Sequence, residues 1–577
     1  MRASSAGAVR TAARPVGANY KWIALSNTTI GTLIATVNAT SILIAMPVIF
    51  RGININPLDP ANFSYLLWLL MGYMVVSAVL VVTAGRLGDM FGRTRVYNFG
   101  FAIFAVSAVG LSAVWSQGAA GAIELIVLRM VQAVGGAMMM ASSAAILTDA
   151  FPPSQRGLAL GVNQIAAMGG SFLGIVVGGV LASYNWRWIF LINVPIGIVG
   201  AIWGFWQLRE IGTRHRARID WIGNVTFAAG LSMILIGVTS GIQPYGGSSM
   251  GWGNPEVIAL VSGGIVVMLL FAYWETRTAD PMFHLDLFKI RAFTLGNVAG
   301  LLGSVARGGL QFMLVIWLQG IWLPLHGYDY TQTPLWAGIY MLPLTCGFLV
   351  AGPLSGTLSD RFGARPFATG GMLLSAVSFA LLMLIPADFS YPVFAFLIFL
   401  NGISMGMFAS PNTVGIMNSV PARHRGVASG IRVTFMNVGL PLSIGLFFTL
   451  MIVGLNSTVP AALYSGLTAD GVPPAVAHHL AGLPAISYLF ASFLGYNPLA
   501  TLLGPVLGQL PPADAARLTG QTFFPSLISA PFQHGLVLVL SFSIAASLVA
   551  AAASALRGGR YVHEEEEARA PAAVAEA

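Results

Sequence analysis

Gly85-Arg86-Leu87-Gly88-Asp89-Met90-Phe91-Gly92-Arg93-Thr94-Arg95 is the stretch that decides the fold. It lies between two apolar runs, 65–84 and 96–115, and each is close to the roughly 20 residues that cross a bilayer as a helix. A second copy, Gly356-Thr357-Leu358-Ser359-Asp360-Arg361-Phe362-Gly363-Ala364-Arg365, also lies between apolar runs. Because a repeated loop indicates two related halves, the sequence predicts an all-α membrane protein built from an internal repeat.

Composition supports a polytopic membrane protein. Mean hydropathy is +0.78 and only 8% of the residues are charged, whereas soluble domains average about 25%. The net charge of +8 therefore indicates topology, and we expect no nucleic-acid partner. The single cysteine, Cys346, excludes an intramolecular disulfide and a cysteine metal cluster. The first apolar run, 22–50, is too long for a cleaved signal peptide.

Hydropathy predicts fourteen spans, and the lysines and arginines predict their orientation. With the N-terminus inside, 22 of the 28 basic residues fall inside, three fall outside and three lie within spans, so both termini are expected to be cytoplasmic. The predicted spans are about 22–49, 64–84, 96–115, 122–147, 157–182, 188–208, 220–242, 255–275, 293–324, 333–356, 367–386, 391–418, 427–455 and 533–556.

The pattern Gly-x-Leu-x-Asp-x-x-Gly-x-x-Arg between spans two and three resembles the signature loop of the major facilitator superfamily. Because the second copy follows span ten, spans seven and eight are an insert between two six-helix halves. This six-two-six order resembles the fourteen-helix drug:proton antiporter branch, as does the stretch Trp186–Gly197. The resemblance implies gating loops that pair charges and separate them on opening, with these residues: Gly85, Asp89, Gly92, Arg93, Arg95, Gly356, Asp360, Arg361 and Gly363.

Two further motifs resemble that branch. Leu128–Gly136 matches Arg-x-x-Gln-x-x-Gly in span four, which implies a role for Arg129 in proton coupling. An arginine at this depth is expected to face the bundle interior and to have a partner. In span five, Gly170, Gly174 and Gly178 recur every fourth residue, so they allow close helix packing. They resemble the antiporter motif of exporters, although Ile175 stands where that motif usually has proline.

Span one departs from the branch at its acidic position. The stretch Thr36–Pro47 aligns with a motif that usually begins with aspartate, and here that position is Asn38, which cannot titrate. A proton-driven exporter needs a group that binds and releases a proton. The remaining candidates are Glu124 and Asp149 near the ends of span four, and Asp89 in the signature loop. For Glu124 and Asp149 interfacial anchoring is the alternative.

The spans also contain candidates for a cationic cavity. Arg307 lies near the centre of span nine, too deep to reach water, which makes it a candidate site residue. Arg432 lies near the inner end of span thirteen, where it could instead extend to water. Together with Arg129 they predict a positively charged cavity, to which Asn38, Gln164 and Gln311 could add hydrogen bonds. Packing alone is the competing explanation for each polar residue.

The predicted organisation has five parts. They are an N-terminal cytoplasmic segment (1–21), a six-helix bundle (22–210), a two-helix insert (211–291), a second bundle (292–556) and an acidic cytoplasmic tail (557–577). The second bundle includes a long outside segment, 456–532, with few charges. Because a solvated loop would be more polar, we expect short helices that lie on the outer leaflet or cap the outer mouth.

These features predict a transporter and not an enzyme, without cofactor or metal. The first hypothesis is a monomeric, proton-coupled exporter of small amphiphilic compounds, of the multidrug type, in the cytoplasmic membrane of a bacterium and in contact with membrane lipids. One alternative is an exporter or flippase of an endogenous lipid or of an anionic or zwitterionic amphiphile. Another is an uncoupled facilitator or uptake carrier, which Asn38 favours. The chain contains no Gly-x-x-x-x-Gly-Lys loop, which excludes an ATP-driven pump by itself.

Overall fold

The computed structural model describes residues 19–56, 59, 62–152, 155–211, 220–278, 281–421, 425–495 and 497–558. Within these residues the chain is helical and holds no β-strand. Fourteen helical segments of this part are long and apolar enough to cross a membrane, which confirms the predicted number of spans. Lipid offers no partner to a backbone N–H or C=O group, so these apolar spans fold as helices.

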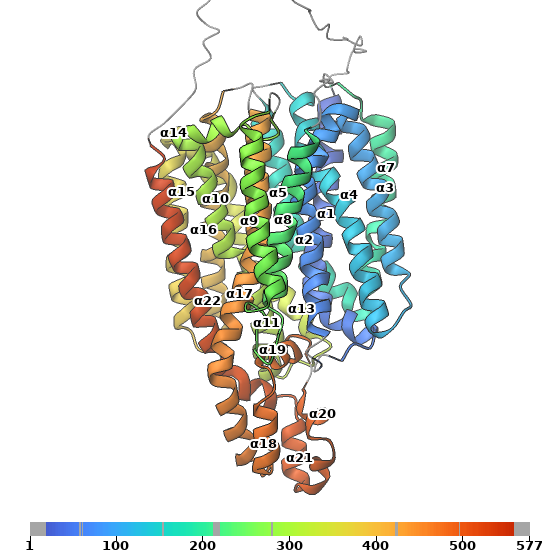
Figure 1. Ribbon diagram of the computed structural model, residues 1–577, viewed down its shortest axis with the longest axis vertical. Coiled ribbons are helices and arrows are strands. Elements are labelled where there is room, and N and C mark those ends of the chain that lie inside the picture. The colour runs from blue at the N-terminus through green and yellow to red at the C-terminus, as the bar shows by residue number, and fades with distance from the viewer. Residues whose placement is uncertain are drawn as a thin grey trace, which may run out of the picture.

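The helices of the first half and the insert stand side by side along the long axis of the molecule (Figure 1). Among the described residues they are α1 (Tyr20–Gly52), α2 (Phe63–Phe91), α3 (Arg93–Ser112), α4 (Gly118–Ala150), α5 (Arg156–Tyr184), α6 (Trp188–Leu191), α7 (Asn193–Gln207), α8 (Trp221–Gly241) and α9 (Pro255–Glu275). A short 3-10 helix, Leu285–Lys289, follows α9.

The second half begins with one span that is broken along its length. Its described parts are α10 (Arg291–Arg307), α11 (Leu310–Trp317), a turn of π-helix (Leu318–Trp322) and α12 (Leu323–Leu325). The other described elements are α13 (Thr333–Tyr340), α14 (Leu342–Phe362), α15 (Ala364–Leu384), α16 (Tyr391–Asn418), α17 (Arg425–Ala469), α18 (Pro474–Ala481), α19 (Ala485–Phe493), α20 (Leu499–Leu503), a 3-10 helix (Gly504–Gln509), α21 (Pro512–Thr519) and α22 (Phe523–Leu556).

The two halves repeat one packing pattern. In the first half α4 packs against α2 and α3, and in the second half α16 packs against α14 and α15. Both copies of the signature sequence end a helix at a glycine with positive φ, 110° at Gly92 and 87° at Gly363. That conformation is accessible to glycine without steric cost, so each copy makes the same sharp turn. We call the end of the bundle with these turns the loop end, and both ends of the described chain lie there (Figure 1).

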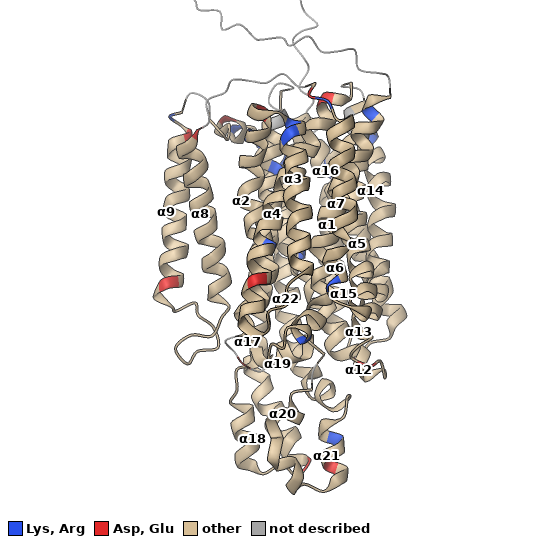
Figure 2. Cartoon of the chain, turned by 90° about the vertical axis from the view of Figure 1, so that its right-hand side faces the viewer, with Lys and Arg blue, Asp and Glu red and all other residues tan. Residues whose placement is uncertain are grey.

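The insert helices α8 and α9 pack on each other as a pair at one side of the molecule (Figure 2). α8 contacts α2 of the first half and α17 of the second half. The outer helix α9 exposes large apolar side chains along its length, including Ile258, Val266 and Leu270. An exposed apolar face of this length fits lipid contact, as expected for a peripheral membrane helix.

Two helices of the second half are longer than the sequence predicts. α17 continues to Ala469 and α22 begins at Phe523, so both ends of the predicted outside segment prolong the bundle helices. Their extensions and α18–α21 form a protrusion at the end of the bundle away from the loops (Figure 1), which we call the cap. Hydropathy falls where a helix leaves the lipid, but the helix itself continues because its backbone bonds are internal.

Within the cap, α19 turns back toward the bundle. Its axis is bent by 83° from that of α18, and all its residues from Ala485 to Phe493 are buried. Buried apolar residues of the cap, such as Leu480 and Leu518, belong to the same hydrophobic cluster as Ile44 and Leu314 of the bundle. The cap is therefore packed into the bundle. This agrees with the prediction that the segment caps the mouth of the bundle, and not with the alternative that it lies on the membrane surface.

The interior differs between the two ends of the bundle. Near the cap, the interior span from Phe312 to Pro324 is buried without interruption. Near the loops, a Cβ added at Gly161, Gly169 or Gly430 would meet open space, and Gln164 of α5 is exposed. The interior is thus tightly packed near the cap, whereas parts of α5 and α17 nearer the loops have free space beside them.

Candidate functional site

The first signature turn is held by ion pairs on Arg93. Its guanidinium donates to Asp89 Oδ1 (2.8 Å) and to Asp149 Oδ1 at the end of α4 (2.7 Å). The backbone N–H groups of Arg93 and Thr94 donate to the carboxylate of Glu210 (3.0 and 3.2 Å). A carboxylate at a helix N-terminus is favourable because the first N–H groups have no partner inside the helix. The turn therefore ties α2, α4 and the end of the first bundle together.

The sequence analysis placed Asp89 and Arg93 in this signature turn, as parts of a gating loop. It named Asp149 only as a candidate for binding the coupled proton. It missed Glu210, although an acid directly after Arg209 in a basic connection was a usable signal. Arg95 is exposed, and Gly85 has open space around its α carbon. The three side chains that form the pairs are partly exposed, so each pair contributes little energy by itself.

The second turn lacks this lock. The position that corresponds to Arg93 is Ala364, and Arg361 is exposed. The side chain of Asp360 lies outside the described residues. Gly356 faces α16, because a Cβ there would lie 2.7 Å from Ser410 Oγ. The second half therefore repeats the backbone turn, but it has no arginine at the position of Arg93 to form the corresponding ion pairs.

Arg129 is buried between three helices of the first half, with 1% of its surface exposed. It donates to Asn38 Oδ1 of α1 and to Gln132 Oε1 (2.8 Å). Its guanidinium also lies over the ring of Tyr73 on α2, 4.3 Å from the centroid. The predicted partner therefore exists, but it is neutral: the amide of Asn38 occupies the place of a carboxylate. Glu124 lies about 7.5 Å nearer the cap along α4 and is partly exposed.

Arg307 and Arg432 both reach α16 from different helices. Arg307 of α10 donates its Nε–H to Gly303 O (3.0 Å) and lies over the ring of Phe408, 5.2 Å from the centroid. Arg432 of α17 donates to Thr413 Oγ1 (3.2 Å). Within the described residues no carboxylate pairs with either arginine.

Each of these two guanidiniums keeps a buried nitrogen without a hydrogen-bond partner in the described structure: Nη1 of Arg307 and Nε of Arg432. The amide nitrogen of Gln311, one turn from Arg307, is in the same condition. Buried donors are normally satisfied, and an unpaired one costs about 1–3 kcal/mol. This part of the second half therefore offers donors and positive charge to a ligand.

A third arginine, which the sequence analysis placed at the start of the cytoplasmic tail, reaches α16 at the loop end. Arg557, at the end of α22, is buried and donates to the side chain of Asn412. Burial lowers the pKa of Arg557 to about 10, so it remains charged at neutral pH. Figure 2 shows the resulting charge pattern: acidic residues lie toward the two ends of the bundle, whereas basic residues also occur along its middle.

The glycines of α5 face α1. A Cβ on Gly170, Gly174 or Gly178 would lie within 2.9, 2.4 and 2.6 Å, respectively, of a backbone oxygen of α1. α5 is one uninterrupted helix that includes Ile175, whose side chain is buried. The two helices can approach this closely because the stripe carries no side chains.

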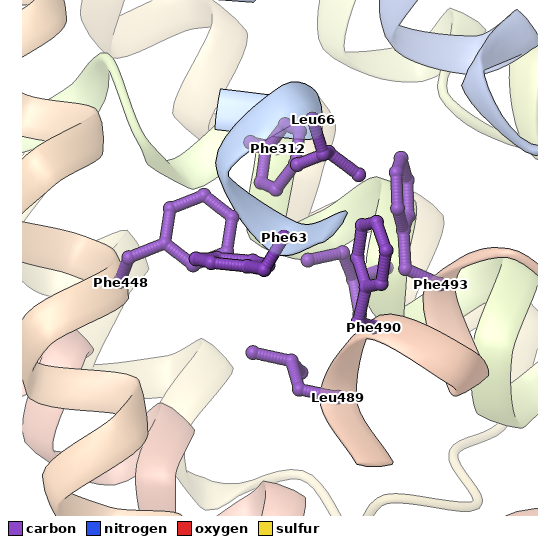
Figure 3. Close-up of a pocket in the computed structure, with 8 residues that line it drawn as sticks. Phe63, Leu66, Phe312, Phe448, Leu489, Phe490 and Phe493 are labelled. Atoms are coloured by element: carbon purple, nitrogen blue, oxygen red, sulfur yellow. The ribbon is translucent and has the colours of Figure 1, made fainter. Parts of the chain in front are cut away.

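An apolar pocket lies on the cap side of the interior, between α2, α11, α17 and α19 (Figure 3). The space between its side chains is too narrow to hold a water molecule, and its lining is Phe63, Leu66, Phe312, Ile316, Phe448, Leu489, Phe490 and Phe493. Phe490 packs edge-to-face on Phe63, with ring centroids 5.4 Å apart. α19 of the cap thus closes a pocket whose other walls come from both halves of the bundle.

Comparisons with known proteins agree with this architecture. The family model described as Major Facilitator Superfamily matches residues 28–444. The chain is 28% identical to the riboflavin transporter RibZ of Clostridioides difficile over 74% of this chain and 87% of that protein. It is 27% identical to the tetracenomycin C resistance and export protein of Streptomyces glaucescens, over 76% and 77%.

A solved structure gives the same fold. The chain matches a bacterial homologue of the human lysosomal transporter Spinster, solved in an inward-facing and unoccupied conformation, with a TM-score of 0.55. The match covers 94% of this chain and 98% of that one at 15% identity.

Proposed function

The chain belongs to the Major Facilitator Superfamily, and on that basis we propose that it exports hydrophobic or amphiphilic compounds by alternating access, coupled to protons. A membrane transporter needs an interior that opens to one side at a time. The observations that carry the proposal are the tight packing near the cap, the free space beside α5 and α17 nearer the loops, and the buried unpaired donors of Arg307 and Arg432. Export is favoured by the relative that is named for resistance and export.

In this proposal the loop end faces the cytoplasm of a bacterium and the chain works as a monomer in the cytoplasmic membrane. The basic residues support the orientation, because the signature loops carry many of them and cytoplasmic loops are enriched in lysine and arginine. The structure would then represent the state that takes up substrate from the cytoplasm. Export requires the α19 side to open and the Arg93 side to close.

The substrate we propose is an amphiphile with an anionic or zwitterionic group, a lipid being one example. Arg307 and Arg432 supply positive charge and unpaired donors, and no described carboxylate neutralises them. An anionic group would bind there through charge-assisted hydrogen bonds, which are stronger than neutral ones. The apolar part would lie against the aromatic walls toward the cap.

Purified protein in liposomes tests the substrate class. We expect anionic amphiphiles to be transported and permanently cationic dyes to be transported poorly. Arg307→Ala should reduce transport about tenfold or more, because a lost hydrogen bond to a charged group is worth about 1.5–3 kcal/mol. Arg291→Ala is the matched control, since Arg291 is exposed at the other end of α10. Full-rate transport of cationic dyes, with no competition by amphiphiles, would refute the proposed substrate class.

The competing function is an uncoupled facilitator or uptake carrier. It is favoured by Asn38, because the partner of Arg129 cannot exchange a proton, and a relative is named as a riboflavin transporter. A pH-sensitive dye trapped in the liposomes separates the two. Substrate-dependent proton flux supports antiport, with Asp89 or Asp149 released from Arg93 as carriers. Substrate movement without proton flux supports the facilitator.

A further inference from the structure

Two acidic side chains meet at the loop end of the α8–α9 pair, outside the interior described above. Asp220 caps α8, and its Oδ1 accepts hydrogen bonds from Gly223 N and Trp274 Nε1, both at 2.9 Å. Glu275 is the last residue of α9 and is 3% exposed. Its Oε2 accepts a hydrogen bond from Phe283 N at 3.1 Å. One oxygen of each carboxyl group is therefore occupied by N–H donors.

The other oxygen of each group points into one small space. A Cβ added at Gly223 would lie 2.2 Å from Asp220 Oδ2 and 2.9 Å from Glu275 Oε1, so the two oxygens are within about 5 Å of each other. Both atoms are buried, and neither has a hydrogen-bond partner among the described residues. Glu275 is thus a nearly inaccessible side chain whose free oxygen is directed at a second carboxyl group.

Among the residues that the structure describes, no cation forms an ion pair with either carboxyl group. Arg86 of α2 is the cation near Glu275, but its Nη2 donates to Pro281 O at 2.6 Å. Arg277, two residues after Glu275, lies over the ring of Tyr273 instead. Two carboxylates within about 5 Å resist joint ionisation because like charges repel, and the burial of Glu275 adds to the cost of its charge.

We propose that Asp220 and Glu275 together form a proton-binding site that holds one proton on the pair of carboxyl groups. Binding takes one proton from water at the loop end and leaves the pair with a single negative charge. Release returns that proton to the same water and leaves two charges, to which Arg86 is attracted.

This site is connected to the first signature turn. Arg86 belongs to the turn sequence, and Thr83 Oγ1 of α2 donates to Asn224 Oδ1 of α8 at 3.1 Å. Val79 of α2 and Phe227 of α8 also share a hydrophobic cluster with residues of α16 and α17. A change of charge on Asp220 and Glu275 therefore acts on α2 next to the first signature turn. The proton concentration at the loop end would then bias the closure of that end. The inference does not depend on the substrate or on export.

Infrared spectroscopy of the purified full chain in lipid nanodiscs tests the site directly. Between about pH 5 and about pH 8, near which raised carboxyl pKa values fall, we expect loss of a protonated-carboxyl band. The band should be missing in both Glu275→Gln and Asp220→Asn. Glu256→Gln, which changes an exposed acid at the opposite end of α9, should keep it. A wild-type spectrum without the band, or a band that survives in Glu275→Gln, overturns the proposal.

A second titration tests the connection to the gate. Arg86→Gln removes the nearby cation, so the band should persist to higher pH, by a several-fold change in proton affinity, whereas Arg86→Lys should retain most of the wild-type midpoint. Stability provides an independent measurement. Because the folded state holds an extra proton, wild-type stability should fall as pH rises through the midpoint, up to tenfold in the unfolding constant per pH unit. Glu275→Gln should lack this slope, and an equal slope in both proteins contradicts the site.

Discussion

Gly174 offers the sharpest test of how α1 and α5 are held together. In Gly174→Ala the new Cβ would lie 2.1 Å from Thr40 Oγ1, 2.4 Å from Val37 O and 2.9 Å from Val37 Cα. The threonine hydroxyl can rotate away, but the backbone of Val37 cannot. Since carbon contacts are comfortable only near 3.5 Å, the two helices must separate by roughly 1 Å.

The expected cost follows from two opposing effects. Forcing a methyl group into a packed site costs about 1–3 kcal/mol, whereas replacing glycine by alanine in a helix gains about 0.5–1 kcal/mol. The control is Gly169→Ala on the same helix, where the Cβ meets open space and only the gain remains. We therefore expect Gly174→Ala to be less stable than Gly169→Ala by about 1–3 kcal/mol.

Thermal unfolding of both variants in detergent measures this difference, and liposome transport shows whether the spacing matters for turnover. The same methyl group is added to the same helix in both proteins, so helix propensity cancels from the comparison. If Gly174→Ala is as stable as Gly169→Ala, the close approach of α5 to the backbone of α1 is wrong. Equal stability with unequal transport would not rescue it.

Three other changes have defined outcomes. Asn38→Ala should lower the free energy of unfolding by about 1.5–3 kcal/mol, because the buried Arg129 loses a hydrogen-bond acceptor. Asn38→Asp should retain stability and add substrate-dependent proton flux. If Asn38→Ala is as stable as the wild type, the contact between Asn38 and Arg129 is wrong. Phe490→Ala should loosen the cap end, seen as faster alkylation from the cap side of a cysteine placed at Leu66, in a Cys346→Ser background; an unchanged rate would remove α19 from the closure. Asp149→Asn should cost less than about 1 kcal/mol, since the pair with Arg93 is partly exposed, yet should change transport; a large loss of stability would indicate a structural role instead.

The sequence predicted the helices better than their ends. The spans follow from hydropathy and length, which report directly on lipid exposure, so their number was correct. The ends of α17 and α22 were placed too close to the membrane, because a helix that leaves the lipid keeps its internal hydrogen bonds while its hydropathy falls. The position of α19 could not be predicted either. A nine-residue helix of mainly apolar side chains can lie on a membrane surface or close the mouth of a bundle. Only the aromatic rings that surround it in the fold distinguish the two.

The candidate site was predictable where partners share a motif and obscure where they do not. The spacing of Asp89 and Arg93, four residues apart, predicts a local pair. Glu210, which bonds to the same turn, is more than 100 residues away, and no periodicity connects them. Asp220 and Glu275 are also far apart in the sequence, and the packing of α8 on α9 brings them together. Asn38 is different. It stands where related sequences usually have aspartate, and the structure places its side chain in contact with Arg129.

The distribution of acids constrains how protons could drive this transporter. Along the interior, the described arginines Arg129, Arg307 and Arg432 meet amides, hydroxyls and aromatic rings, and none of them meets a carboxylate. Two of the three candidate acids, Asp89 and Asp149, share Arg93 at the loop end, and the third, Glu124, is partly exposed on the cap side of Arg129. A proton bound at the loop end comes from the same side as the substrate, so antiport through Asp89 or Asp149 requires these acids to reach the opposite side when the halves rock. Regulation of the gate by protons has no such requirement. The geometry therefore favours a loop end that senses protons over an interior that carries them, and Asn38→Asp tests that distinction by adding a carboxyl group inside.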